Sequence, residues 1–404
     1  MQKEVIEDIA RDRSRGGDAP LSWHIITSEY PPQIGGVSDY TRQVATGLAT
    51  QGDNVHVWCP ASGNAEDEGV TVHGEMGRMT PQDLRRVGRQ LDQFPAPRRI
   101  LVQWVPHGYG YRSMNLGFCW WLRQRAARRD SVDLMVHEPY LDFQLRSWRQ
   151  NGAAAVHRLM TAVLLSAASR VWMSIPAWEK CLRPYAFGRA LPFAWLPIPS
   201  TVPVVASKAC TAEVRRRFAP DGTVIIGHLG TYGWPITSLL EPVLETLAED
   251  PRAQSILLMG RGSDAFRAKI IAAKPDRAAR IHATGELPPQ ELSCHLAACD
   301  LLLQPYPDGV SSRRTSFMAG LSHGKPVVTT SGALTEDLWA ASASVPIASG
   351  GASELIEWTR RLCDNAGERS RFGMAATELY RQHFELQRVI ETLRSTALLP
   401  ARPY

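Results

Sequence analysis

The stretch that decides the fold runs from Pro305 to Thr330 and reads PYPDGVSSRRTSFMAGLSHGKPVVTT. A short apolar run, 301–303, precedes it and is typical of a buried parallel strand. The pattern then predicts a loop opening at Asp308-Gly309, a helix beginning near Ser312 and a further strand over 326–330. Ligands of open α/β sheets bind at the carboxyl ends of the strands, so we expect this loop and helix start in a crevice.

Hydroxyl and guanidinium groups crowd the expected helix start. They belong to Ser311, Ser312, Arg313, Arg314, Thr315 and Ser316. Unpaired backbone N–H groups and the positive end of the helix dipole favour negative charge at such a position. Ser312 could instead be only an N-cap, with solvated arginines beside it. The nearby carboxylate of Asp308 favours a ligand with both hydroxyls and phosphates, which describes a nucleotide sugar.

The chain opens with a strand, a glycine-containing loop, a helix and a second strand, over 23–28, 29–36, 38–50 and 54–59. Gly35-Gly36 at the turn lets the backbone approach a ligand closely, although a tight turn without a ligand is the alternative. A similar strand-helix alternation restarts near residue 223. We therefore predict an α/β protein with two doubly wound parallel sheets.

Prolines cluster between the two alternating runs, at positions 192, 197, 199 and 203, which is typical of an interdomain linker. The predicted parts are an N-terminal mobile tail (1–20), an N-terminal Rossmann-like domain (21–203), a C-terminal Rossmann-like domain (204–384) and a last helix (385–404). That helix could cross back to the first domain. Its apolar stripe consists of Leu386, Val389, Ile390, Leu393 and Leu398.

The composition is that of an ordinary globular chain, with 404 residues, 44% of them hydrophobic and 21% charged. A net charge of +5 is too small to indicate nucleic acid, although it permits an anionic acceptor or membrane surface. The seven scattered cysteines are predicted to be reduced thiols of a cytoplasmic protein. We find no Asp-x-Asp or zinc spacing, no signal region, and no apolar run near the ~20 residues of a membrane helix.

The 305–330 segment resembles the donor-binding segment of retaining glycosyltransferases of family 4. These enzymes have the GT-B architecture, in which two Rossmann-like domains face a central cleft. Their pattern is Glu, seven residues, Glu, then Ala-Met, followed by a Gly-x-Pro-Val-Val strand. Here Asp308 stands for the first Glu, Ser316 for the second, and Gly324 begins GKPVV. Serine lacks the carboxylate that usually binds the nucleotide ribose in the family.

Two further stretches carry the resemblance. The string 31–57, which contains Gly35 and Gly36, is similar to the family's glycine loop, which meets the donor phosphates. His137 follows a predicted strand at the position where the family has a histidine near the reacting sugar. His107 is the competing candidate, and a structural hydrogen bond is the alternative for either residue.

Three loops of the second half are similar in position to the family's donor loops. Thr231 lies in the loop that replaces a Gly-Arg-Leu segment, and the Arg and Lys that the family uses there are missing. Arg261, with Arg313 and Arg314, could compensate, although Arg261 could equally form a surface salt bridge. Leu287 stands where the family frames the nucleobase with backbone groups.

The resemblance implies a retaining, metal-independent transfer of a sugar from a nucleotide-diphosphate donor to an acceptor hydroxyl, with no cofactor. Asp308 would orient a sugar hydroxyl, His137 would hold the sugar, and the basic helix start would stabilise the leaving diphosphate. The acceptor could be a saccharide, a lipid-linked compound or a small molecule. Membrane contact through 118–129 is the less favoured interpretation, because such a stretch is more often a core helix with one solvated side.

Three alternatives stay open. A non-catalytic GT-B partner protein is compatible with Ser316 and with the missing basic pair. A GT-B epimerase or phosphorylase would need another acid/base set or a pyridoxal-binding lysine. A dinucleotide-dependent dehydrogenase would need Gly-x-Gly-x-x-Gly, which the sequence around Gly35 does not match.

Overall fold

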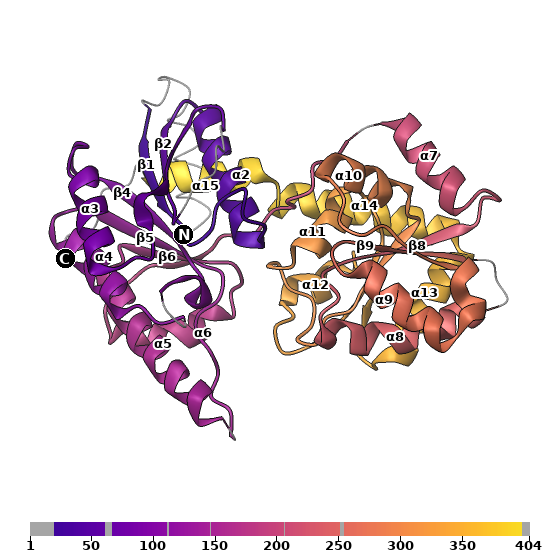
Figure 1. The fold of residues 1–404 in the computed structure, drawn as a ribbon. Helices are drawn as coiled ribbons and strands as arrows, with labels where there is room; N and C mark the ends of the chain where they lie inside the picture. The colour runs from indigo at the N-terminus through magenta and orange to yellow at the C-terminus, as the bar shows by residue number, and fades with distance from the viewer. Residues whose placement is uncertain are drawn as a thin grey trace.

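The computed structural model describes residues 20–60, 67–110, 113–145, 147–205, 207–250 and 254–397. Except for Pro20, the predicted N-terminal tail lies outside the described residues, and so does Leu398 of the predicted apolar stripe. The described residues form two parallel β-sheets, one in each half of the chain, with helices on both faces (Figure 1).

The first sheet has seven strands in the order β3-β2-β1-β4-β5-β6-β7, all paired in parallel. The strands are β1 (Ser22–Ile26), β2 (Asn54–Trp58), β3 (Val70–His73), β4 (Arg99–Trp104), β5 (Ser131–Val136), β6 (Arg170–Met173) and β7 (Phe193–Trp195). Its helices are α2 (Gly36–Thr50), α3 (Pro81–Leu91), α4 (Leu116–Ala127), α5 (Trp148–Ala167) and α6 (Trp178–Leu182), with short 3₁₀ turns η1 (Gly74–Met76), η2 (Pro106–Gly108) and η3 (Arg183–Ala186).

The second sheet has six parallel strands in the equivalent order, β10-β9-β8-β11-β12-β13. The strands are β8 (Val224–Leu229), β9 (Gln254–Met259), β10 (Ile281–Ala283), β11 (Leu301–Gln304), β12 (Val327–Thr330) and β13 (Ile347–Ala348). The helices are α7 (Lys208–Phe218), α8 (Trp234–Glu249), α9 (Ser263–Ala273), α10 (Pro289–Ala298), α11 (Thr315–Ser322), α12 (Asp337–Ser342), α13 (Ala352–Asp364), α14 (Ala366–His383) and α15 (Leu386–Ala397), with the 3₁₀ turn η4 (Pro275–Ala279).

Both sheets are doubly wound, as the sequence predicts. In each sheet the first strand of that half, β1 or β8, lies in the interior of the sheet. The next two strands of the chain lie on one side of it and the later strands lie on the other side, which is the Rossmann strand order. All residues of β9 and β11 are buried, because helices cover both faces of the sheet. Each sheet therefore has a switch point where the carboxyl ends of its strands border a crevice.

The chain end returns to the first domain. Val389, Ile390 and Leu393 of α15 are buried in the same apolar cluster as β1, β2 and α2 (Figure 1, yellow helix). Gly47 of α2 makes this contact close, because a Cβ there would lie 2.9 Å from Ile390 Cδ1. The predicted domain boundary near residue 203 falls between β7 and α7.

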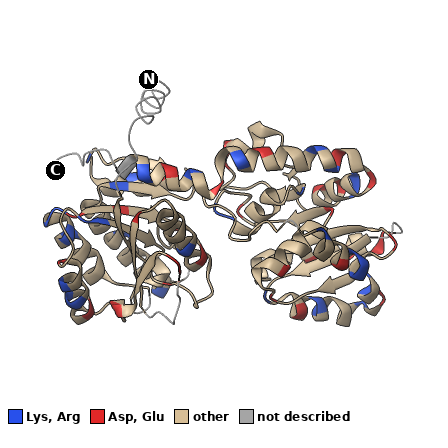
Figure 2. Ribbon diagram, turned by 90° about the horizontal axis from the view of Figure 1, so that it is seen from above, with Lys and Arg blue, Asp and Glu red and all other residues tan. Residues whose placement is uncertain are grey.

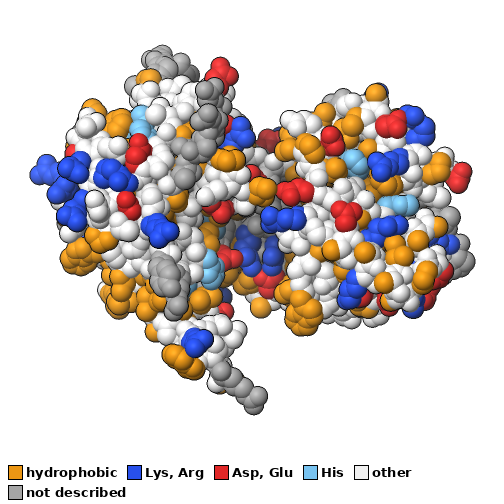
Figure 3. Space-filling model, viewed as in Figure 1, with side chains coloured by type: hydrophobic (Ala, Val, Ile, Leu, Met, Phe, Trp, Pro, Cys, Tyr) orange, Lys and Arg blue, Asp and Glu red, His pale blue; other side chains and the backbone are white. Residues whose placement is uncertain are grey.

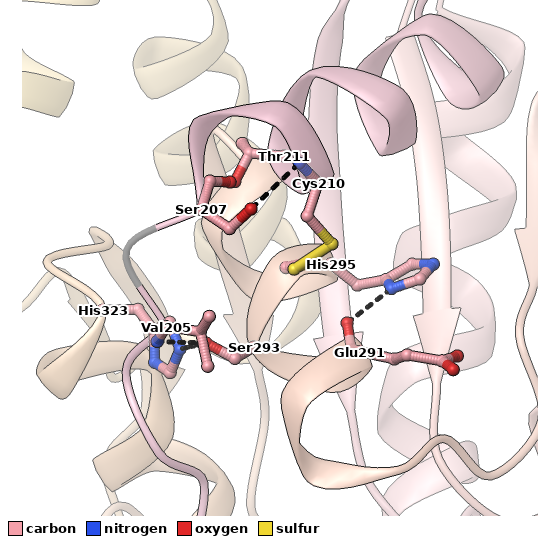
Figure 4. The surroundings of a disulfide bond; sticks show 9 residues. Val205, Ser207, Cys210, Thr211, Glu291, Ser293, His295 and His323 are labelled. Atoms are coloured by element: carbon pink, nitrogen blue, oxygen red, sulfur yellow. Dashed lines mark hydrogen bonds between the residues drawn. A yellow bond between two sulfur atoms is a disulfide. The ribbon is translucent and has the colours of Figure 1, made fainter.

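The prediction that all cysteines are reduced is wrong for one pair. A disulfide joins Cys210 of α7 to Cys294 of α10, across 84 residues of sequence (Figure 4). The other five cysteines form no disulfide. Spacing along the chain carried no sign of this bond, because only the packing of α7 against α10 brings the two residues together.

Replacing Cys210 and Cys294 by alanine should lower the free energy of unfolding by about 4 kcal/mol, because the bond closes a long loop in the unfolded chain. Thermal melts without reductant measure this loss. Dithiothreitol should lower the melting temperature of the wild type towards that of the double variant and leave the variant unchanged. A Cys181→Ala variant is the control. Equal melting of the wild type and the double variant without reductant would contradict the bond.

Charged residues of both signs are spread over both domains, and basic residues gather at the end of the first domain that lies farthest from the second (Figure 2). Among the described residues, no helix combines the length and apolar character needed to cross a bilayer. The same part of the chain contains no group of three or more His, Cys, Asp or Glu side chains placed to hold a metal ion.

Candidate functional site

A hollow separates the two domains, and side chains of both charges gather in it (Figure 3). The loop after β11 in the second domain meets the loops after β5 and β6 in the first domain. Arg313 Nη1 lies 3.4 Å from Glu138 Oε1, and Ser312 Oγ lies 3.0 Å from the backbone oxygen of Ser174. The carboxyl ends of the two sheets therefore face the same space.

Two arginines and an aspartate form the centre of this site. Arg313 donates to one carboxylate oxygen of Asp308 at 2.7 Å, and Arg314 pairs with the other oxygen. Arg313 also lies over the Trp178 ring, 5.6 Å from its centroid, and Arg314 lies 4.7 Å over Tyr306. The two cations are thus held side by side by one carboxylate and by aromatic faces.

The two arginines are largely buried, and some of the buried polar atoms around them lack a hydrogen-bond partner among the described residues. The side chains of Arg313 and Arg314 are only 19% and 23% exposed. Burial lowers the pKa of Arg313, and neighbouring Arg314 adds to this shift, while Asp308 and Glu138 oppose it. Among the described residues, the buried Nε of Arg313, the buried Nε of Arg314 and the buried Ser311 hydroxyl have no hydrogen-bond partner. Buried donors normally find an acceptor, so this position suits a bound anion.

The helix that was predicted to begin near Ser312 begins at Thr315, and Arg314 occupies its N-cap position. Glu336 explains the difference. Its carboxylate accepts from the backbone N–H of Ser312 at 2.7 Å and also from the Ser312 hydroxyl. Ser312 therefore joins the loops of the second domain to Ser174 of the first, with Trp195 donating to its hydroxyl at 3.3 Å.

Glu336 is a site residue that the sequence did not reveal. Its Oε2, which accepts from the backbone N–H of Ser312, also accepts from the indole N–H of Trp339 at 2.6 Å. Burial raises the pKa of this carboxyl group, and the hydrogen bonds from Ser312 and Trp339 oppose that rise. An acidic residue in the loop after the next parallel strand was the available signal, because that loop ends at the same edge of the sheet.

The position of the second family glutamate, Ser316, lies in the first turn of α11. Its hydroxyl is 2.9 Å from the hydroxyl of Tyr306. Burial raises the pKa of Tyr306 to about 12, so this phenol stays protonated. Thr315, the first residue of α11, is half-buried beside it. The helix start thus presents two hydroxyl-bearing side chains and no carboxylate.

His137 lies directly after β5, as predicted, and packs edge-on against Tyr40 at 5.1 Å. Burial lowers its pKa to about 3, so the imidazole is neutral at physiological pH. Its Nε2 lies 2.8 Å from the side-chain oxygen of Gln103. That oxygen can only accept, so Nε2 carries the proton and Nδ1 remains an acceptor. His107 is 48% exposed and lies 3.7 Å from Glu138.

The glycine loop stands at the start of α2, with Gly35 in the N-cap position. A side chain at Gly35 would meet Glu29, whose Oε1 would lie 2.3 Å from a Cβ. The Glu29 carboxylate accepts from the backbone N–H of Ser38 at 3.0 Å. It therefore occupies the anion-binding end of α2, while the space beside Gly36 is open. A phosphate at this loop would have to share the helix start with Glu29.

The remaining predicted residues lie in loops after β8, β9 and β10. Thr231 and Arg261 are exposed, and Leu287 is half-buried. The first two loops are in contact, since a Cβ at Gly262 would lie 3.3 Å from the Thr231 backbone oxygen. Arg261 is exposed at the start of the loop after β9.

Two Rossmann-like domains whose strand ends face one hollow define the GT-B fold, and the sequence-based prediction of this fold is confirmed. No family model and no curated protein matches the sequence. Solved structures do match the fold. They include Anabaena HepE in complex with UDP-glucose, with a TM-score of 0.68 and 14% identity over 93% of this chain and 99% of that one.

Two further solved structures have comparable likeness. Sucrose-phosphate synthase from Thermosynechococcus elongatus has a TM-score of 0.70 and 15% identity over 93% of this chain and 98% of that one. WaaG, described as a glycosyltransferase involved in lipopolysaccharide biosynthesis, has a TM-score of 0.62 and 13% identity over 94% of this chain and all of that one. At such identities the likeness shows the shared fold, whereas membership of family 4 stays a prediction.

Proposed function

We propose that this chain is a retaining glycosyltransferase that moves a sugar from a nucleotide-diphosphate sugar to an acceptor hydroxyl. The observation that carries the proposal is the set of three buried donors without partners at Ser311, Arg313 and Arg314. These donors lie at the carboxyl ends of the strands in a GT-B fold, and the solved glycosyltransferase structures that resemble this chain have the same fold. UDP-glucose is the first donor to test, because it is bound in the HepE structure.

The site can supply the charge that such a reaction needs. Negative charge develops on the leaving diphosphate, and preorganised guanidinium groups in a half-buried position stabilise it. The proposal includes no metal and no cofactor, since Arg313 and Arg314 provide the positive charge. Arg261, Thr231 and Leu287 border the same sheet edge and would contact the nucleotide. Gly36 would admit a phosphate oxygen from the opposite domain.

The sugar would lie between Asp308 and His137. A diphosphate that takes over the arginines would release the Asp308 carboxylate to accept from a sugar hydroxyl. The neutral His137 would offer Nδ1 as an acceptor to another hydroxyl. In a retaining reaction on one face of the sugar, the departing phosphate oxygen accepts the proton of the acceptor hydroxyl. The close approach of the Ser312 hydroxyl, which donates to Glu336, to the backbone oxygen of Ser174 would bring the two domains together around the reactants, and a closed site would limit hydrolysis.

Thermal shift against UDP, GDP, ADP, CDP and dTDP tests this function, together with mass spectrometry of the matching sugar nucleotides. A ligand at ~100 times its dissociation constant should add about 2.7 kcal/mol of stability. We expect one nucleotide to raise the melting temperature and its sugar donor to be hydrolysed slowly. Absence of any shift would favour a non-catalytic protein of this fold, in which Glu29 and Ser316 have replaced donor contacts.

A further inference from the structure

The outer side of the first domain carries an unusual concentration of exposed apolar side chains. Of the eleven large apolar side chains that are exposed among the described residues, six lie on α4, α5 and the loop between 141 and 147. We call these six residues the α4–α5 face: Leu116, Trp120, Phe143, Leu145, Trp148 and Leu159. Soluble proteins rarely gather exposed apolar residues in this way unless the surface binds something.

The sequence around Trp120 only partly explains this surface. Phe118, Cys119 and Trp121 are buried, as expected of a core helix, whereas Trp120 is 54% exposed. Four of the six residues lie elsewhere: Phe143 and Leu145 are in the loop before α5, and Trp148 and Leu159 are on α5, a helix that contains no acidic residue. The loop before α5 and the first turn of this helix project from the body of the domain (Figure 1). Leu145, in that loop, has no cover at all from the protein.

The charges on α4, on α5 and beside the two exposed tryptophans are basic, and exposed Asp142, next to Phe143, is the acidic residue in the loop before α5. The sequence contains no Asp or Glu from 93 to 129 or from 143 to 178. Arginines instead lie beside the aromatic rings: Arg123 is 5.6 Å from the Trp120 centroid and Arg149 is 5.3 Å from that of Trp148. Such pairs place a cation at the depth of an indole ring, where a lipid phosphate would lie.

We propose that the α4–α5 face docks on the surface of a membrane that contains anionic lipid. Tryptophan and leucine side chains would enter the interface, and the arginines would pair with lipid phosphates. A second copy of the chain fits less well, because a twofold contact would bring the same arginines against each other. Membrane contact is thus favoured by the structure more than by the sequence, in which only the stretch around Trp120 suggested it.

Sedimentation with vesicles tests this proposal on the full chain. One set of vesicles is phosphatidylcholine alone, and the other contains one quarter phosphatidylglycerol. The test variant is Trp148→Glu combined with Leu159→Glu. The matched control is Trp234→Glu on α8 of the second domain, since Trp234 and Trp148 are both 79% exposed. We expect the wild type to bind the anionic vesicles, more weakly at high salt, and the test variant to lose at least about tenfold in partition.

The Trp234→Glu control should bind the vesicles like the wild type. Nucleotide-induced stabilisation should be the same in all three proteins, so that failure here differs from failure of the proposed enzymatic function. The proposal is overturned if the wild type does not bind, if it binds neutral and anionic vesicles equally, or if both variants lose binding alike. Light scattering that shows a wild-type dimer and a monomeric test variant would assign the face to self-association instead.

Discussion

Replacing Arg313 by alanine should weaken the binding of a nucleoside diphosphate by about 10- to 100-fold, because a hydrogen bond to a charged group contributes about 1.5–3 kcal/mol. Arg313 is 19% exposed and bridges Asp308 and Glu138, so its guanidinium is already fixed in the hollow. Arg313→Lys should recover only part of the affinity, since an ammonium group cannot make two parallel bonds. Calorimetric titration with the nucleotide found by thermal shift measures both changes.

The Asp308→Asn variant separates the two proposed roles of the Asp308, Arg313 and Arg314 cluster, which are diphosphate binding and sugar transfer. The carboxylate competes with a diphosphate for both arginines, so the amide should leave diphosphate affinity unchanged or raise it. Sugar transfer, or slow donor hydrolysis, should nevertheless fall, because an amide stabilises positive charge on the sugar ring less well. Arg216→Ala is the control, since this arginine is exposed on α7 and pairs with Glu213. Wild-type affinity in Arg313→Ala would refute the assignment of the anion site.

The alternation of strands and helices was enough to predict two doubly wound sheets, because buried parallel strands such as 301–303 form continuous apolar runs. Strand β3 was not predicted, because it lies at the edge of its sheet, has no fully buried residue and contains no continuous apolar run; the two residues of β13 give no pattern. The position of Asp308 and Arg313 in a loop after a parallel strand also predicted that they lie in a crevice at the edge of the sheet. It could not show that Asp308 holds both arginines, because that depends on side-chain directions after the turn at Gly309.

Long-range partners account for what the sequence did not reveal. Glu336 meets Ser312 across 24 residues and moves the start of α11 to Thr315. Glu29 fills the space that the absent side chain of Gly35 leaves. Cys210 and Cys294 meet only after α7 and α10 have packed. In each case the local sequence is compatible with several partners, and only the tertiary packing determines which partner is used.

The protein should lose stability as the pH falls below about 6.5, and His24 should account for a measurable part of the loss. His24 is 1% exposed in β1, and its Nδ1 lies 3.3 Å from the indole N–H of Trp58. An indole nitrogen can only donate, so this Nδ1 must be unprotonated. Burial is the main cause that lowers the pKa of His24 to about 3, and the charges of His56, His73, Arg98 and Arg125 contribute to the same shift.

The sign follows from proton linkage. Above pH 6.5 the imidazole is neutral in both states, so it contributes no pH dependence. Between 6.5 and about 3 the unfolded chain binds a proton that the folded chain excludes, and the free energy of unfolding falls by about 1.4 kcal/mol per pH unit. His24 alone should therefore cost about 2.7 kcal/mol between neutral pH and about 4.5. His56 and His73, whose pKa values burial also lowers, add to the loss.

Urea unfolding at several pH values measures the effect in the wild type, His24→Gln and Trp58→Phe. Glutamine can still accept from Trp58 but binds no proton. His24→Gln should therefore reduce the number of protons taken up on unfolding by up to one, and the free energy of unfolding should fall less steeply as the pH is lowered. Trp58→Phe removes the indole donor and some packing, so it should lower stability at every pH and retain a proton uptake close to that of the wild type. Parallel curves for His24→Gln and the wild type would show that acid acts through other groups. A flattened curve for His24→Gln alone would place the excluded proton on this imidazole, because loss of packing lowers a stability curve without removing a titrating group.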